Sequence, residues 1–282
     1  MPLPQRGAQR ASSGRSIRRS VAAIALALVV LGGLATNPTP AAAAAGMKVV
    51  VVVGPAGSST SRYIVSARRY ASEARSYGAR VVELYSPNAT WTKVKAAAQG
   101  ASVLIYLGHG NGSPSPYGPF SALTQDGLGL NASAGHGNFN VKYWGEYYIR
   151  TQIRLAPNAI VILNRLCYAS GNSEWGAANP TRAVAIKRVD NFGAGFLRAN
   201  ARAVFAEGIT SASYILAGVF RSNKTIGQIF MGGPSAMGAR DFTFSSVRTP
   251  GTRAWMDPMA PSRYYRSVIG YLTLNAARVR GS

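Results

Sequence analysis

The sequence is poor in three residue types that carry much protein chemistry. Among 282 residues it has 9 acidic residues, 2 histidines and 1 cysteine. A lone cysteine excludes an internal disulfide, which leaves a buried inert thiol, an intermolecular bridge or a reactive thiol. The content of hydrophobic residues, 47%, excludes a disordered chain and is enough for a packed core.

The scarcity of acids makes the chain strongly basic. Its 31 basic residues give a formal charge of +22, and the five arginines before residue 46 leave about +17 for the remainder. Such a charge favours anionic polymers and surfaces. The arginines are scattered, without a lysine-rich tail or an RNA-binding signature with interleaved aromatic residues. We therefore expect attraction to an anionic cell-envelope polymer and no specific binding of nucleic acid.

Residues 1–45 have the pattern of a signal peptide. Arg15, Arg18 and Arg19 precede an apolar run over 21–34, and the small residues of "TPAAAAAG" follow. This run is shorter than the roughly 20 residues that a membrane-spanning helix needs. We therefore expect cleavage near residues 43–45, a secreted or extracytoplasmic location, and no integral membrane segment afterwards. An uncleaved anchor is the alternative, and the leader suits a bacterium.

From residue 47 onward, short apolar runs alternate with stretches of helical spacing. The pattern predicts strands over 47–54, 79–86, 102–108, 158–166 and 201–208, and helices over 61–78, 90–100 and 181–200, the last interrupted near its glycines. Two successive strand-helix-strand units imply a parallel sheet, and uninterrupted Val, Ile and Leu runs imply strands buried on both sides. We expect an α/β fold with a mainly parallel sheet of five or six strands and helices on both faces.

The remaining segments are less regular. Residues 111–157 are rich in Gly, Ser, Asn and Pro, and a loop of this length in a compact domain is usually functional or mobile. Short helices are predicted over 211–223 and 225–233. The tail from 241 is predicted to be irregular, with a late strand over 264–275. This organisation gives an α/β domain over 46–240 and a C-terminal extension over 241–282 packed on the same domain.

Two apolar runs end in residues that could form a site. His109 and Gly110 follow the run 102–108, and Cys167 follows the run 158–166. Parallel strands end at the same edge of a sheet, where ligands bind, and neighbouring strands lie about 4.8 Å apart. If these two strands are neighbours, His109 and Cys167 reach one substrate.

The chemistry of these residue types is that of a cysteine hydrolase. An imidazole can accept the thiol proton and then protonate a leaving amine, while the thiolate attacks a carbonyl. The glycines beside His109 allow close approach of a substrate, and a backbone amide at such a turn can stabilise an oxyanion. The alternative is structural: His109 satisfies a loop carbonyl and Cys167 packs in the core.

The stretches "VLIYLGHGNG" and "VILNRLCYASG" resemble the caspase-like cysteine peptidase superfamily, which includes caspases, gingipains, clostripain, legumain and the CHAT domains. The resemblance covers roughly residues 47–210. It implies a three-layer sandwich, a catalytic dyad of His109 and Cys167, an oxyanion hole with the amide of Gly110, a peptide or protein substrate, and neither metal nor cofactor. Leu166 departs from the small residue that many members have before the cysteine.

Many members also have a charged residue in the primary specificity pocket. Glu207, after the fifth predicted strand, and Asp126, in the long loop, are candidates that would favour basic side chains of a substrate. An ordinary loop or capping role is the alternative for both. A catalytically silent member that binds peptide or an anionic cell-envelope polymer is the alternative to an enzyme.

The sequence contains other candidate functional features, for which the pattern is less specific. His136 rivals His109 but has no preceding strand to hold it, and a metal site of His109, His136 and Cys167 lacks recognisable zinc spacing. The stretch "GPAGSST" could cradle a phosphate with its amides, or it could be a plain strand-to-helix turn. The aromatic residues in 143–149 either line a cleft or pack on the sheet, and residues 172–174 are close enough to Cys167 to orient His109 or a substrate.

Overall fold

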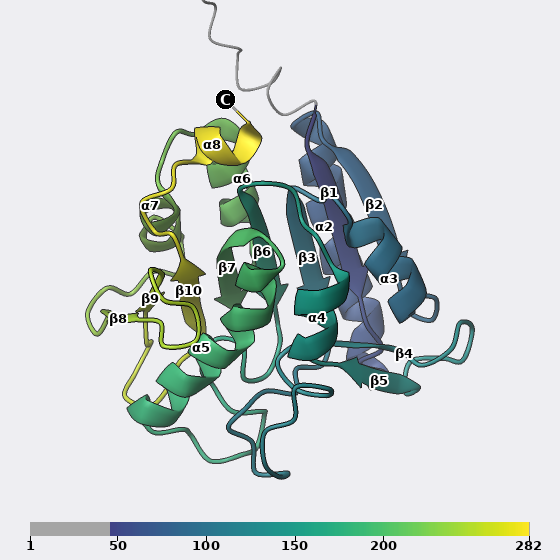
Figure 1. Cartoon of the computed structure of the whole chain (residues 1–282), viewed down its shortest axis with the longest axis horizontal. Helices are drawn as coiled ribbons and strands as arrows, with labels where there is room; N and C mark the ends of the chain where they lie inside the picture. The colour runs from purple at the N-terminus through teal and green to yellow at the C-terminus, as the bar shows by residue number, and fades with distance from the viewer. Residues whose placement is uncertain (1–45, 282) are drawn as a thin grey trace, which may run out of the picture. The chain divides into compact units, whose positions relative to one another are not determined.

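Figure 1 shows the computed structural model, which describes residues 46–281. The predicted signal peptide over 1–45 lies outside the described residues. The central sheet has eight strands in the order β2 (Arg80–Tyr85), β1 (Lys48–Val53), β3 (Val103–Leu107), β6 (Ala159–Asn164), β7 (Ala201–Glu207), β10 (Arg266–Gly270), β9 (Arg253–Met256) and β8 (Phe242–Ser245). The first five are parallel and the last three antiparallel. The expected α/β fold with a mainly parallel sheet is confirmed, but five or six strands was too few.

The additional strands come from the C-terminal part of the chain. We predicted an irregular tail from residue 241 with one strand over 264–275. Strand β10 lies in that range, but β8 and β9 also extend the sheet. Each has only four residues and pairs in an antiparallel meander. Residues 242–270 are therefore part of the central sheet.

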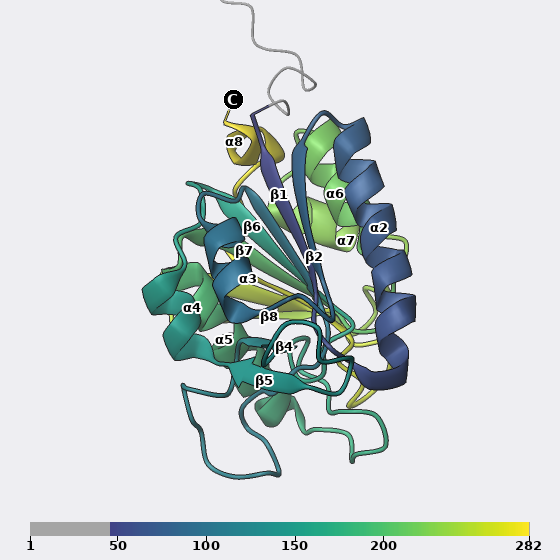
Figure 2. The same cartoon turned by 90° about the vertical axis from the view of Figure 1, so that its right-hand side faces the viewer.

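Helices cover both faces of the sheet, as Figure 2 shows. On one face lie α2 (Thr60–Ser76), α6 (Ser213–Arg221), α7 (Ile226–Met231) and α8 (Ala276–Arg280), and on the other lie α3 (Trp91–Ala98), α4 (Glu146–Gln152) and α5 (Arg182–Arg198). Successive strand residues enter opposite cores: Val49 and Val51 pack with α2, whereas Val50 and Val52 pack toward α3. Burial on both sides explains the uninterrupted apolar runs.

Helix α5 is continuous, although we expected an interruption at its glycines. Gly193 and Gly195 are buried where neighbouring elements come close. A Cβ at Gly193 would lie 2.5 Å from the Cγ2 of Ile269 on β10, and one at Gly195 would lie 3.0 Å from the Cγ of Glu146. The glycines therefore allow α5 to pack closely on the sheet and on α4.

The long irregular segment contains structure that the sequence pattern did not predict. Between β3 and β6 it forms a small antiparallel sheet of β4 (Leu128–Asn131) and β5 (Val141–Trp144), followed by α4. Tyr143, Trp144 and Tyr148 are half-buried here, whereas Tyr147 is exposed. Trp144 stacks on Trp91 at 5.1 Å and meets Tyr148 edge-on at 4.7 Å. Trp144 and Tyr148 therefore fit the packing interpretation of this cluster, and Tyr147 does not. Within residues 46–281, no helix combines the length and apolar character needed to cross a bilayer.

Candidate functional site

The strands that precede His109 and Cys167 are neighbours. β3 pairs with β6 in parallel, and Leu107 lies opposite Asn164 at their ends. The two loops that follow are in contact, because a Cβ on Gly110 would lie 2.1 Å from the carbonyl oxygen of Cys167. The fold therefore brings the two predicted segments together at the carboxyl edge of the sheet.

A tight turn presents Cys167. Arg165 and Tyr168 have left-handed backbone angles, with φ of 63° and 68°. The amide of Arg165 donates to the carbonyl of Glu207 at 2.8 Å, and that of Ala169 donates to the carbonyl of Cys167 at 2.8 Å. Non-glycine residues rarely adopt this conformation, and such strain clusters at functional sites.

The residue before the cysteine, Leu166, is also part of this site. Leu166 is 4% exposed and belongs to the hydrophobic core, whereas Cys167 is half-buried and lines a pocket of about 870 Å³. Leu166 also lines this pocket, so it contributes an apolar part of the wall beside the thiol. The larger residue at this position is thus shared between the core and the pocket wall.

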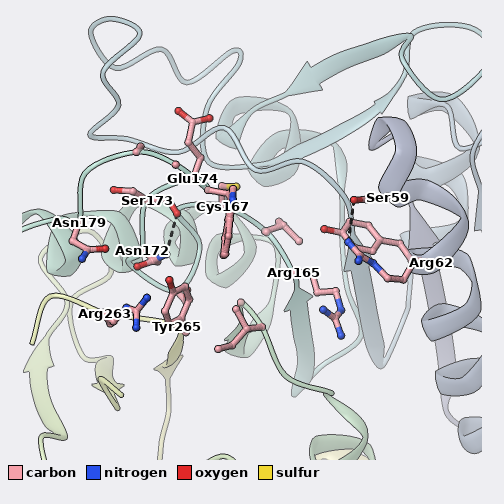
Figure 3. Close-up of a pocket in the computed structure, with 18 residues that line it drawn as sticks. Ser59, Arg62, Arg165, Cys167, Asn172, Ser173, Glu174, Asn179, Arg263 and Tyr265 are labelled. Carbon is pink, nitrogen blue, oxygen red and sulfur yellow. Dashed lines mark hydrogen bonds between the residues drawn. The ribbon is translucent and has the colours of Figure 1, made fainter. Parts of the chain in front are cut away.

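The pocket lies where four parts of the chain meet (Figure 3). Its wall is formed by the start of α2, the loops after β6 and β7, and the segment before β10, with Arg62, Cys167, Asn172, Glu174, Arg263 and Tyr265 among the lining residues. His109 does not line it. His109 is an exposed residue of the loop after β3, and its backbone carbonyl accepts a hydrogen bond from the hydroxyl of Tyr106 at 3.1 Å.

The pocket wall contains polar atoms that have no partner. Six buried side-chain nitrogen or oxygen atoms lack a hydrogen bond among the described residues, and three of them line this pocket: Nε of Arg165, Oγ of Ser170 and Oδ1 of Asn172. Buried polar groups in proteins are nearly always paired. A polar ligand in the pocket would supply the missing partners.

The charged residues of the pocket are mainly cations. Arg62 and Arg165 lie on one side of Cys167 and Arg263 on the other, while Glu174 is the acidic lining residue (Figure 3). Our sequence reasoning did not identify these arginines. Arg165 lies two positions before the cysteine and could have been noticed, but nothing local connects the other two to it.

Glu174 joins the loops on either side of the site. Its carboxylate accepts hydrogen bonds from the hydroxyls of Tyr117, in the loop after β3, and of Tyr168, at 3.2 Å. Its negative charge adds to the rise in the pKa of Cys167 that burial causes, and it opposes the fall in the pKa of His109 that burial causes. That a residue of the segment 172–174 orients His109 or a substrate stays a prediction.

Burial decides the direction of both pKa shifts. For Cys167, desolvation and then the charge of Glu174 raise the thiol pKa, against hydrogen bonds from the backbone of Trp175 and of Cys167 itself. For His109, desolvation lowers the pKa of the imidazole and Glu174 opposes the shift. Both groups are therefore neutral in the resting site near pH 7, as a thiol beside an imidazole.

The two acids considered for substrate specificity have other positions. Glu207 is 1% exposed and is bonded by Arg266 Nε at 3.0 Å, by Thr210 Oγ1 at 2.6 Å and by Tyr214. Asp126 is fully buried and accepts the amide of Ser113 at 3.0 Å, and burial raises its pKa to about 8. Neither carboxylate lines the pocket.

The weaker candidates also have defined positions. His136 is exposed in the loop between β4 and β5, and residues 46–281 hold no cluster of three His, Cys, Asp or Glu side chains able to bind a metal. The "GPAGSST" stretch forms the short helix η1 (Gly57–Ser59) before α2. There the amides of Ala56, Gly57 and Ser59 bond to Thr60, Asn138 and Ala56 respectively. These internal bonds favour the plain strand-to-helix turn over a phosphate cradle.

Comparisons with known proteins give little further information. No protein-family model and no curated protein matches the sequence. Among solved structures, the chain is similar to the crystal structure of the Arg-specific cysteine proteinase gingipain R, with a TM-score of 0.34 and 12% identity over 82% of this chain and 61% of that one. The chain thus spans less than two thirds of that protein. A similarity this low does not assign the chain to a family or an activity.

Proposed function

We propose that the protein is a cysteine-dependent peptidase or acyl transferase with Cys167 as nucleophile. The observation that carries this proposal is the pocket: a half-buried cysteine on a strained turn lines a cavity that contains three unpartnered polar atoms. A core cysteine would need none of these features. The segment that holds His109 packs directly against this turn.

In this mechanism His109 takes the proton of the Cys167 thiol as the sulfur attacks the substrate carbonyl carbon. The amide of Gly110, which donates to no other group within residues 46–281, stabilises the negative oxygen that forms. Collapse expels the amine, which receives its proton from the imidazolium, and leaves a thioester on the sulfur. Water or another nucleophile, deprotonated by His109, then releases the acyl group and restores the thiol.

The lining charges favour a peptide with an acidic side chain near the scissile bond. Arg62, Arg165 and Arg263 outnumber Glu174, and the guanidinium of Arg165 has a buried Nε without an acceptor. A carboxylate can accept two parallel hydrogen bonds from such a group. This preference is opposite to the basic specificity that Glu207 or Asp126 would have given.

A fluorogenic peptide series tests the proposal. The peptides differ only in the residue before the scissile bond, which is Asp, Glu, Asn, Ala or Lys. We expect faster turnover of the acidic peptides than of the Lys peptide, loss of turnover in Cys167→Ala, and a decrease on the order of 10²-fold or more in His109→Ala. Turnover that persists in Cys167→Ala would refute the mechanism.

Two arginines of one helix provide a matched comparison. Arg62→Gln removes a lining charge, whereas Arg69→Gln removes an exposed charge elsewhere on α2. Only Arg62→Gln should reduce the preference for acidic peptides. Equal effects would mean that overall charge, and not the pocket, sets the specificity.

A silent binding domain is the second candidate, favoured by the raised pKa of Cys167, which keeps the thiol protonated. It predicts that the same acidic peptides bind without being cleaved and that Cys167→Ala retains their affinity. Equilibrium binding beside the turnover assay separates the two functions.

A further inference from the structure

The stretches that connect helices and strands at the edge of the sheet opposite the pocket contain no acidic residues. This amino-terminal edge is formed by the starts of the parallel strands, the end of β10 and helix α8 (Figures 1 and 2). The connecting stretches there are 76–80, 98–102, 153–159, 198–202, 221–225 and 271–281, and none contains Asp or Glu. Acids instead lie in the connections at the other edge, as Asp126, Glu174 and Asp257 do.

Six basic residues of this edge form a set that we call the amino-edge cations: Lys48, Arg80, Arg154, Arg202, Arg221 and Arg278. All except the half-buried Lys48 are exposed, and none forms an ion pair within residues 46–281. By contrast, Arg266 is paired internally with two buried acids, Glu207 and Asp257.

Contacts along the edge show that these cations share one side of the molecule. Lys48 and Arg80 are register partners at the start of β1 and β2. Arg221 lies 5.7 Å from the ring centroid of Tyr77, directly after α2. The carbonyl of Arg278 accepts a hydrogen bond from Asn158, just before β6, at 3.1 Å. Cations from elements between β1 and α8 therefore lie on the same side of the molecule.

An external anion would reduce the repulsion among the amino-edge cations. Like charges on neighbouring strands repel one another. None of the six cations forms an ion pair within residues 46–281, and the carboxylate of Glu73, which accepts a hydrogen bond from the hydroxyl of Tyr77 at 2.9 Å, is near Arg221 alone. Burial and the charge of Arg80 both lower the pKa of Lys48, in keeping with this repulsion. An anionic surface placed against the edge would neutralise all six charges at once.

The position of Gly46, the first described residue, indicates which kind of anionic surface the amino-edge cations bind. Gly46 directly precedes β1, so in the uncleaved chain the segment with the apolar run 21–34 and its arginines joins the described part at this same edge. An apolar run followed by cations is the combination that favours a bilayer with anionic headgroups. A soluble polyanion would use the cations but not the run.

We propose that the amino-edge cations dock the uncleaved chain on an anionic phospholipid bilayer, with the pocket on the edge that faces away from it. Docking in this orientation leaves Cys167 open to substrates from the aqueous side. The proposal is independent of the chemistry at Cys167, since it rests on the opposite edge of the sheet.

Vesicle sedimentation of the full chain tests the proposal. Partition is measured on phosphatidylcholine vesicles with and without phosphatidylglycerol, and the ratio of the two values isolates the effect of lipid charge from that of the apolar run. Replacing Arg80, Arg202 and Arg278 together by Gln should lower this ratio at least 10-fold. A control with Arg69, Arg182 and Arg240 replaced by Gln removes the same charge from exposed sites away from the edge and should change the ratio less than 2-fold.

Further outcomes show whether the amino-edge cations bind a bilayer, a soluble polyanion or any anion without preference. Equal losses in both triple variants, or no loss in the edge variant, overturn the proposal in favour of diffuse attraction. An edge variant that loses binding to soluble polyphosphate while the vesicle ratio is unchanged also overturns it. Replacing the same three arginines by Lys keeps the charge and should keep the ratio, which separates charge loss from misfolding.

Discussion

The backbone of Gly110 lies against the carbonyl of Cys167, so close that a Cβ at residue 110 would stand 2.1 Å from that oxygen. This contact couples the loop of the candidate base to the turn of the candidate nucleophile. It requires glycine for steric reasons, because no side chain fits between the two segments.

Gly110→Ala should therefore damage both the fold and the site. The added methyl must displace the Cys167 turn, which we expect to lower the free energy of unfolding by about 1–3 kcal/mol. Urea unfolding measures the loss, and labelling by a thiol-reactive peptide electrophile should fall with it. Gly118→Ala is the control, since a Cβ there meets nothing within 4 Å, although its φ of 145° adds some backbone strain. Wild-type stability and labelling in Gly110→Ala would show that the two loops do not need this contact.

The reactivity of Cys167 should rise with pH into the alkaline range. Its pKa is raised by burial and by Glu174, so the thiolate fraction at pH 7 is below that of an ordinary cysteine. The rate of iodoacetamide alkylation should keep increasing above pH 9, and Glu174→Gln should move the profile to lower pH by removing a negative charge. A rate plateau below pH 8 would instead indicate a preformed thiolate-imidazolium pair.

Asp126 should make the folded state weaker as pH rises. Its folded pKa of about 8 lies above its unfolded value, because burial first, and then the charge of Glu146, disfavours the carboxylate. The stabilisation is complete below the unfolded pKa near 4 and is lost as pH rises toward 8. Chemical unfolding from pH 4 to 9 measures this loss.

Asp126→Asn should remove most of that dependence. Asn keeps an acceptor for the amide of Ser113 and tolerates the φ of 60° at this position. At pH 9 we expect the variant to be more stable than the wild type by a few kcal/mol at most. A variant with the same pH dependence as the wild type would show that another group is responsible.

Arg188 should be needed to hold the two loops of the site together. From α5 it donates through Nε to the carbonyl of Pro114 at 2.9 Å and through Nη1 to Ser173 Oγ at 3.0 Å, and its guanidinium lies 4.6 Å from the ring centroid of Tyr168. Arg188→Met leaves buried acceptors unpaired, so we expect a loss of about 1–3 kcal/mol in urea unfolding. Lys187→Met, on the exposed side of the same helix, should change stability by less than about 0.5 kcal/mol.

The parallel part of the fold was predictable because its signals are local. The apolar runs that form β1, β3, β6 and β7 are continuous in the sequence, since each strand is buried on both sides. Strands β8 and β9 gave no comparable signal. They are short, half-exposed and stabilised by pairing with β10, so their formation depends on a neighbour that the local pattern does not reveal.

The candidate site was predictable only in part. The proximity of the segments of His109 and Cys167 follows from two strands ending at one edge, which a pattern of runs can indicate. The internal pairing of Glu207 could not be foreseen, because its partner Arg266 lies 59 positions away on an antiparallel strand.

The sequence by itself determined the strongly basic character, the buried parallel strands and the edge at which the cysteine and one histidine follow them. Local composition and periodicity carry that information, because each strand or helix buries its own apolar side chains. Only the tertiary structure decided that arginines from three separate segments share the cavity of Cys167, and that uncompensated cations gather at the opposite edge. Strand order and helix packing set which distant charges become neighbours, and no local spacing encodes them.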